Sequence, residues 1–154
     1  MNLTGQITVS APREAVFEAL RDVPFFASCI DGVSDLVQTG ESTFDAVLAT
    51  KVAYMNFKFK VAIELTRVQP PDEIEARIEG TPLGIVGRLT AISSTRLTES
   101  GDGTKVSYAI DTKLAGKLGS IGQPVMKSKA KEMEKQFAER LRAAFAQPGG
   151  PKAK

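Results

Sequence analysis

The chain carries a long amphipathic helix pattern near its end, and this segment constrains the fold more than any other. Between Ser120 and Phe145 apolar residues recur every three or four positions, with lysines and arginines mostly between them. This spacing gives a helix one apolar and one basic face. Pro124 is typical of a first helical turn, and Gln147-Pro148-Gly149-Gly150 would end the helix. The apolar face needs a surface to pack on, and the strand-like segments before it can supply one.

Seven segments alternate apolar and polar residues, as strands with one buried face do. The first spans residues 3–9, and six more span 33–38, 42–52, 55–68, 73–81, 85–99 and 105–114. Turn-forming residues separate them, for example Gln69-Pro70-Pro71-Asp72 and Ser100-Gly101-Asp102-Gly103. Connections this short favour an antiparallel meander.

Two short helices are expected between the first two strands. Ser10 is a candidate N-cap of the first, with Pro12 in its first turn. Asp22 can cap the second, and Asp31-Gly32 turns the chain into the next strand. The order of one strand, two helices, six strands and one helix predicts an α+β helix-grip fold, in which a curved seven-stranded antiparallel sheet wraps around a long C-terminal helix.

The composition fits one domain in a reducing compartment. A chain of 154 residues can bury about two thirds of its unfolded surface around one core, so we expect a single domain over 1–146 and a flexible tail over 147–154. No window reaches the ~20 apolar residues of a membrane span, and residues 1–20 do not resemble a secretory signal. Cys29, the single cysteine, excludes an internal disulfide. A net charge of +2 does not favour nucleic-acid binding. We expect a cytoplasmic protein.

The residue types exclude much of enzyme chemistry. The chain has no histidine, which rules out Ser-His-Asp triads, Cys-His pairs and imidazole metal sites. Cys29 alone cannot form a thiolate metal site and is expected to be a buried packing residue. We therefore predict no catalytic residue and no metal site. The alternation assigns Asp45, Glu64, Glu73, Glu75, Glu79 and Asp111 to solvent. Asp31, near the expected cavity entrance, stays a candidate acid or base, although an ordinary turn also explains it.

A curved sheet closed by a helix is expected to enclose an apolar cavity. Aromatic faces and flexible thioethers suit a flat or isoprenoid ligand, although each such residue could equally be plain core. Polar groups able to bind a ligand oxygen are Thr50, Tyr54, Asn56 and Tyr108. The predicted ligand-binding wall comprises Phe25, Phe26, Ile30, Tyr54, Phe57, Phe59, Ile78, Ile85, Leu118, Ile121, Val125, Met126, Met133 and Phe137.

Four short motifs carry a family resemblance: Leu3-Thr4-Gly5, the run from Ala11 to Phe17, the turn Cys29-Ile30-Asp31-Gly32-Val33, and Leu114-Ala115-Gly116-Lys117-Leu118-Gly119. In these motifs residues 1–146 resemble the CoxG family of carbon monoxide dehydrogenase, within the START/Bet v 1-like (SRPBCC) superfamily of polyketide cyclases and lipid-transfer proteins. Asp31 stands where members usually have proline. The hydrophobic C-terminal anchor of longer members is missing, which argues against permanent membrane attachment.

The resemblance implies a non-enzymatic accessory protein of a molybdenum-containing carbon monoxide dehydrogenase or related hydroxylase, peripherally associated with the inner face of the cytoplasmic membrane. It would hold no covalent cofactor and would bind a membrane quinone, menaquinone or ubiquinone, or a similar lipid, with residues 25–32 and 116–122 as a gate. Lys127, Lys131 and Lys135 are predicted membrane contacts, although an ordinary solvated helix face also explains them.

Two alternatives stay open. The first is a small cyclase or dehydratase that uses Asp31 or a tyrosine as acid or base, for which a buried carboxylate pointing into the pocket would be diagnostic. The second is a protein-recruitment module without a ligand, whose interior would be filled by side chains.

Overall fold

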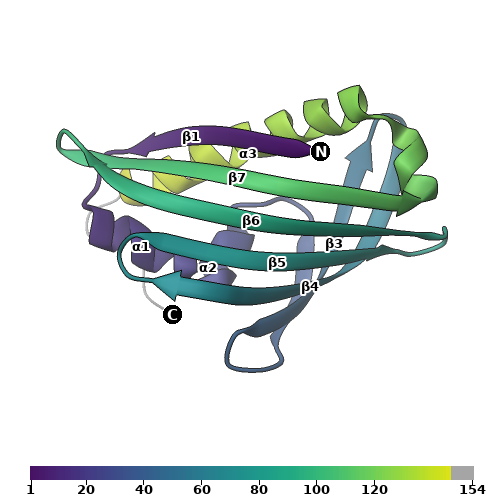
Figure 1. Cartoon of the computed structure of the whole chain (residues 1–154), viewed down its shortest axis with the longest axis horizontal. Helices are drawn as coiled ribbons and strands as arrows, with labels where there is room; N and C mark the ends of the chain where they lie inside the picture. The colour runs from purple at the N-terminus through teal and green to yellow at the C-terminus, as the bar shows by residue number, and fades with distance from the viewer. Residues whose placement is uncertain (147–154) are drawn as a thin grey trace.

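Seven antiparallel strands form one curved sheet in the computed structural model, which describes residues 1–146 (Figure 1). The strands are β1 (Asn2–Val9), β2 (Val33–Gln38), β3 (Thr43–Val52), β4 (Met55–Gln69), β5 (Glu73–Pro82), β6 (Gly87–Ser100) and β7 (Gly103–Gly116). The helices are α1 (Arg13–Arg21), α2 (Val23–Ser28), the 3-10 helix η1 (Lys117–Ile121) and α3 (Gln123–Ala146). The sheet order is β1-β7-β6-β5-β4-β3-β2.

This architecture confirms the predicted helix-grip fold. Every predicted strand agrees with the observed one to within two residues at each end. The last helix begins differently from the prediction, because residues 117–121 form a separate 3-10 helix and α3 starts only at Gln123. Gly122, between the two, has a φ of 94°, which is incompatible with a continuous α-helix. The predicted helix stop and tail, residues 147–154, lie outside the described residues.

The start of α1 corrects a second prediction. Its N-cap is Pro12 and not Ser10, and no side chain caps the helix. A residue that precedes proline avoids the α conformation, so the helix cannot extend back through Ala11 to Ser10. The predicted cap of α2 is confirmed, since the Asp22 carboxylate accepts a hydrogen bond from the backbone N–H of Phe25 at 3.3 Å.

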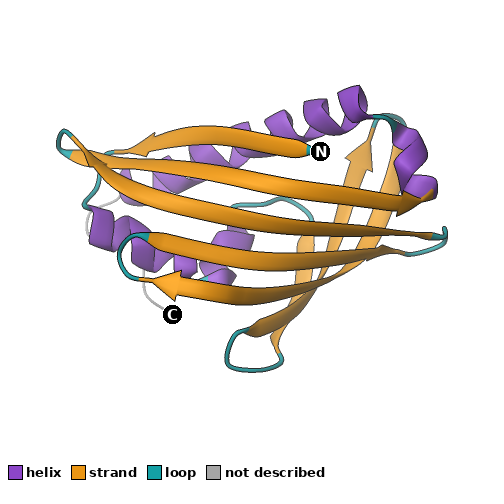
Figure 2. Ribbon diagram, in the orientation of Figure 1, coloured by secondary structure: helices purple, strands orange, loops and turns teal. Residues whose placement is uncertain are grey.

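Helix α3 lies across the open side of the sheet. It contacts β1 at one edge and β3 near the opposite edge, so that it closes the curve (Figures 1 and 2). Helix α1 packs on β6 and β7, and α2 contacts β2. The concave face is therefore covered by helices, and any ligand held there would lie between α3 and the sheet.

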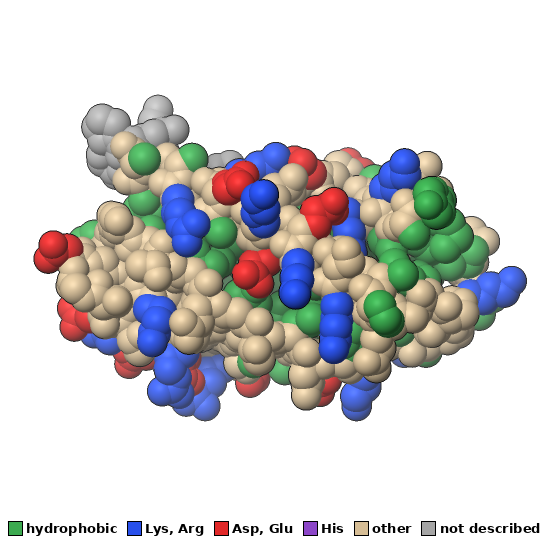
Figure 3. Space-filling model, turned by 90° about the horizontal axis from the view of Figure 1, so that it is seen from above, with side chains coloured by type: hydrophobic (Ala, Val, Ile, Leu, Met, Phe, Trp, Pro, Cys, Tyr) green, Lys and Arg blue, Asp and Glu red, His purple; other side chains and the backbone are tan. Residues whose placement is uncertain are grey.

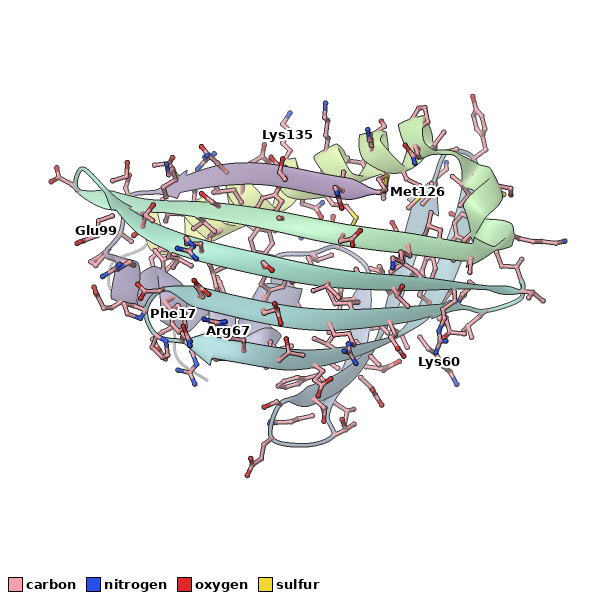
Figure 4. All side chains as sticks on the ribbon, viewed as in Figure 1. Phe17, Lys60, Arg67, Glu99, Met126 and Lys135 are labelled. Carbon is pink, nitrogen blue, oxygen red and sulfur yellow. The ribbon has the colours of Figure 1, made fainter. Side chains whose placement is uncertain are left out.

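The buried apolar side chains form two separate clusters. The first surrounds Phe17 of α1 and joins it to Leu97, Val106 and Leu141. The second consists of Val52, Phe57, Phe59 and Leu118, with Met126 packed against it. Figure 4 shows Phe17 and Met126 near opposite ends of the molecule. Between these two clusters the concave face carries smaller side chains.

Candidate functional site

The middle of the concave face is built largely from small side chains. On β5 the inward-facing positions are Ala76, Ile78 and Gly80, and on β6 Ala91 and Ser93 pair with Ile78 and Ala76. Small side chains at neighbouring positions leave room that larger ones would occupy in a close-packed core.

Glycine at position 80 illustrates this room. A methyl group added there would meet Leu89 and Phe59 at 3.6 Å, an ordinary packing distance. The position could therefore hold a side chain, and its being glycine widens the interior.

Several larger inward-facing side chains in this middle region are only partly buried. Ile63 and Ile78 pair directly across β4 and β5, and Ile110 pairs with Ser93 across β6 and β7. These isoleucines and Met133 of α3 are half-buried and belong to neither buried cluster. Their residual exposure indicates that neighbouring side chains do not fill the space around them.

The structure distributes the predicted wall residues over three places. Phe25 and Phe137 pack against the first cluster. Phe57, Phe59 and Leu118 form the second cluster together with the packed side chains of Ile121, Val125 and Met126. Ile30, Ile78 and Met133 are half-buried, and Phe26, which is more exposed, contacts Phe137 in a tilted arrangement with ring centroids 4.6 Å apart.

Tyr54 and Ile85 lie outside the interior, contrary to the prediction. Val52 pairs with Met55, so Ala53 and Tyr54 form a two-residue turn, and the Tyr54 side chain is 95% exposed. Ile85 is exposed in the loop between β5 and β6. The predicted strands 42–52 and 55–68 already leave residues 53–54 as a turn, so Tyr54 was wrongly added to the wall. Ile85 was predicted inside a strand that begins only at Gly87. Of the other polar candidates, Asn56 is exposed, whereas Thr50 and Tyr108 occupy inward positions.

A phenol–carboxylate pair lies under α3. The hydroxyl of Tyr108 on β7 donates a hydrogen bond to the carboxylate of Glu134 on α3, and both side chains are half-buried. Gly5 of β1 makes room for the pair, since a Cβ atom there would collide with both groups. Burial, reinforced by the adjacent carboxylate, raises the pKa of Tyr108 above its ordinary value. The phenol therefore keeps its proton and remains the donor.

Sequence reasoning missed Glu134, although a signal was present. Glu134 precedes Phe137, Ala138 and Leu141 by three, four and seven positions, the spacing of the buried face of α3. A charged residue at such a position needs a polar partner on the facing sheet. Tyr108, an inward polar residue of β7, is that partner.

Asp31 fastens a turn to α3. Its carboxylate lies 2.6 Å from the Arg140 guanidinium and accepts a hydrogen bond from the Gln136 amide at 2.5 Å. Its backbone N–H donates to the Gln136 side chain at 3.1 Å. The carboxylate is 64% exposed and faces the helix surface. Asp31 therefore has the contacts of a structural latch and not those of an acid or base in the interior.

In residues 1–146, neither Cys29 nor the acidic residues nor the depression on the outer face forms a reactive-thiol, metal or apolar-ligand site. Burial raises the pKa of the Cys29 thiol, which disfavours the reactive thiolate. Within residues 1–146 no group of three or more potential ligands could hold a metal ion. A depression of about 330 Å³ on the outer face of the sheet is lined by charged residues such as Arg67, Glu73 and Arg96, which suits no apolar ligand.

The predicted membrane contacts on α3, Lys127, Lys131 and Lys135, are all exposed. Figure 4 shows Lys135 pointing away from the body of the protein. In the part of the chain that the structure describes, no helix is long and apolar enough to cross a bilayer.

Comparison with known proteins now identifies the family. The sequence matches, over residues 5–146, the family of the CoxG subunit of carbon monoxide dehydrogenase. The chain belongs to the CoxG family. This confirms the resemblance carried by the four sequence motifs. CoxG is a family of accessory subunits and not a known catalytic family.

Solved structures agree with this assignment of the CoxG chain. A conserved protein from Geobacillus kaustophilus has 26% identity and a TM-score of 0.86, with 95% of each chain covered. A protein from Chromobacterium violaceum has 14% identity and a TM-score of 0.69 over 96% of this chain and 98% of its own. Ara h 8.0201 has 12% identity and a TM-score of 0.67 over 93% and 95%. These last two establish a Bet v 1-like fold only. A search of curated proteins gives no match.

Proposed function

We propose that this CoxG protein is a carrier that binds a hydrophobic small molecule, a membrane quinone or similar lipid, between α3 and the curved sheet. The observation that carries this proposal is the run of small inward side chains, Ala76, Gly80, Ala91 and Ser93, between the two buried clusters. A flat ring needs a slot between layers of apolar side chains, and a face without large side chains offers one.

The phenol–carboxylate pair supplies the polar contact that such a ligand needs. The proton of Tyr108 is already donated to Glu134, so the pair presents mainly acceptor oxygens to the interior. A hydroquinone hydroxyl can donate to them, whereas a quinone carbonyl cannot. Thr95, directly opposite Tyr108 on β6, adds a hydroxyl that can donate or accept.

The two segments of the proposed gate differ in how firmly they are held. Residues 25–32 are held to α3 by the contacts of Asp31 with Gln136 and Arg140 and by the contact of the Phe26 ring with Phe137. Residues 116–122 begin and end with Gly116 and Gly122, whose φ angles are 66° and 94°. The second segment therefore has the backbone freedom to move and would open for ligand exchange.

We further propose, on the family name, that this carrier serves a molybdenum-containing carbon monoxide dehydrogenase or related hydroxylase. It would exchange a quinone, menaquinone or ubiquinone, with the inner face of the cytoplasmic membrane. Binding and release need no catalytic side chain, and the protein would act by non-covalent transfer.

One observation favours a second candidate, an acid–base enzyme of the cyclase or dehydratase type. Glu134 is a half-buried carboxylate on the inner side of α3, the feature that this alternative requires. Among residues 1–146, the side chain hydrogen-bonded to Glu134 is a tyrosine whose raised pKa makes it a very weak acid near neutral pH. The pair is therefore better suited to anchoring a hydroxyl than to moving protons.

Filling the interior tests the carrier function. In Ala91→Leu the added side chain would enter the middle of the concave face, while Ala62→Leu makes the same change at an exposed position of β4. We expect quinone retention, measured by native mass spectrometry after loading with menaquinone or ubiquinone, to fall about tenfold or more in Ala91→Leu, because ~1.4 kcal/mol of lost contact suffices.

The Ala62→Leu control should retain quinone like the parent. If the parent protein retains neither quinone, or if Ala91→Leu retains it unchanged while folded by circular dichroism, the carrier proposal fails.

A further inference from the structure

Exposed apolar side chains gather at one end of the molecule. Tyr54 and Met55, at the turn between β3 and β4, are 95% and 52% exposed, and Val86, between β5 and β6, is 79% exposed. Leu83 and Ile85 in the same loop are also exposed. We refer to these five residues as the apolar tip.

The segments that form the apolar tip are connected to each other and to η1. The backbone N–H of Leu83 donates to the Lys58 carbonyl at 2.8 Å, and the N–H of Lys117 donates to the Val86 carbonyl at 3.0 Å. Figure 1 places the β5–β6 loop and η1 at the right-hand end of the molecule, and Figure 3 shows hydrophobic side chains gathered at that end. Exposed apolar side chains grouped in this way usually mark an interaction site.

The charge around the apolar tip has a single sign. The segments that build this end, residues 46–60, 80–90 and 113–122, contain no Asp or Glu. Lys51, Lys58 and Lys117 are exposed there, and none of them forms an ion pair with another residue in the range 1–146. The surface thus combines protruding apolar side chains with uncompensated positive charge.

We propose that the apolar tip docks on an anionic lipid bilayer. Tyr54, Met55 and Val86 enter the interfacial region, and Lys51, Lys58 and Lys117 contact lipid phosphates through their long side chains. A tyrosine is well suited to this depth because its ring is apolar and its hydroxyl is polar.

Charge complementarity selects the bilayer over a second copy of this chain. Two copies meeting tip to tip would bring the same lysines against each other, with no acidic residue from segments 46–60, 80–90 or 113–122 to offset them. Anionic headgroups supply the missing negative charge.

Docking by the tip rests on the proposed carrier function and deepens it, because it places the movable gate at the membrane. Leu118 of η1 is fully buried against the second cluster directly behind the tip. Gly116 and Gly122 flank this plug. With the tip in the headgroup layer, displacement of η1 would open the interior toward the lipid phase.

This orientation differs from docking through the lysines of α3. Lys135 lies eight positions after Lys127, about 12 Å farther along the helix at 1.5 Å per residue, and so away from a bilayer at the tip. Docking through the tip and docking through the α3 lysines therefore predict that different substitutions weaken membrane binding.

Vesicle flotation of the full chain separates them. The vesicles contain phosphatidylcholine alone or with phosphatidylglycerol, and no quinone. We expect binding to phosphatidylglycerol vesicles that falls about tenfold in Tyr54→Ser/Val86→Ser and in Lys51→Gln/Lys58→Gln/Lys117→Gln, since each removes one of the two signals that peripheral attachment needs. Val37→Ser, an exposed apolar position on β2, and Lys127→Gln/Lys131→Gln/Lys135→Gln should bind like the parent.

The proposal is overturned if the parent does not bind phosphatidylglycerol vesicles, if the tip variants bind like the parent, or if the α3 variant alone loses binding. Quinone retention measured without vesicles keeps this outcome separate from the carrier function. Tip variants that lose vesicle binding but retain quinone support both proposals, whereas vesicle binding by a protein that retains no quinone supports the tip alone.

Discussion

Under the proposed carrier function, the pair formed by Tyr108 and Glu134 would decide which head group the interior prefers. A carboxylate that already accepts the phenol hydrogen has further lone pairs for a ligand hydroxyl and no proton to offer a carbonyl. If this pair anchors the head group, the protein should bind a reduced ring better than an oxidised one.

Glu134→Gln tests this preference. The amide introduces donors that a quinone carbonyl can use, so we expect the affinity ratio of hydroquinone to quinone to fall by about tenfold or more, since a hydrogen bond to a charged group contributes ~1.5–3 kcal/mol. The ratio is measured by anaerobic titration with a short-chain quinone in both redox states. Glu132→Gln, an exposed position on the same helix, is the control. An unchanged ratio in Glu134→Gln would contradict the anchoring role.

Individual residues also show which side-chain positions could be predicted from the sequence and which could not. Phe57 and Phe59 could be assigned to the interior because period-2 alternation holds along the middle of a strand. Tyr54, three positions earlier, was assigned to the wall although the predicted strands 42–52 and 55–68 already left residues 53–54 for the turn that the structure shows. Glu134 was overlooked because its partner lies on a distant strand.

At the level of elements, the contact between the α2–β2 turn and α3 joins segments more than a hundred residues apart in sequence. Asp31, Gln136 and Arg140 make this contact on the surface of α3. It holds residues 25–32, one segment of the proposed gate, against the helix.

Asp31→Asn should loosen that gate with a small loss of stability. Because the ion pair is largely exposed, we expect the free energy of unfolding to fall by only about 0.5–1 kcal/mol. Hydrogen exchange at residues 25–32 should nevertheless accelerate, which mass spectrometry of deuterated peptides can measure. Asp45→Asn, an exposed position on β3, serves as the control. Equal exchange in both variants would show that the latch does not hold this segment.

Elements differ in how far the sequence determines them. All seven strands could be located because each combines alternation with turn residues at both ends. The division between η1 and α3 could not, since apolar residues continue at helical spacing through the Gly122 break. The positive φ angle of a single glycine cannot be inferred from the spacing of apolar residues.

For the whole molecule, the raised pKa of Tyr108 predicts how stability depends on alkaline pH. An unfolded chain loses the tyrosine proton near the ordinary pKa of about 10, whereas the folded protein keeps it to higher pH. The folded state then binds more protons than the unfolded state, so stability should decline as pH rises above ~10.

Urea unfolding of the parent and of Tyr108→Phe at pH 8 and at pH 11 measures this. The difference in unfolding free energy between the two pH values should be smaller in Tyr108→Phe, because that variant lacks the titrating group. An identical difference in both proteins would mean that Tyr108 does not contribute to alkaline unfolding.

Which surface residues the fold brings together was the feature least predictable from the sequence. The apolar tip joins the β3–β4 turn to the β5–β6 loop and borders η1, three segments far apart in sequence. Each segment contains only a few apolar residues among turn residues, so no single segment predicts an exposed apolar surface. Their grouping depends on how strongly the sheet curves.

The separation of the buried side chains into two clusters affects how such a protein can change during evolution. Most fully buried apolar side chains belong to these two clusters, whereas Ala76, Ala91 and Ser93 belong to neither and Gly80 borders the second next to Phe59. Exchanging one of these four for a larger side chain would reduce the space inside, at the cost that extra volume in a packed interior carries. Under the proposed carrier function, single substitutions here would therefore change which ligands the interior accepts while the residues of both clusters stay the same.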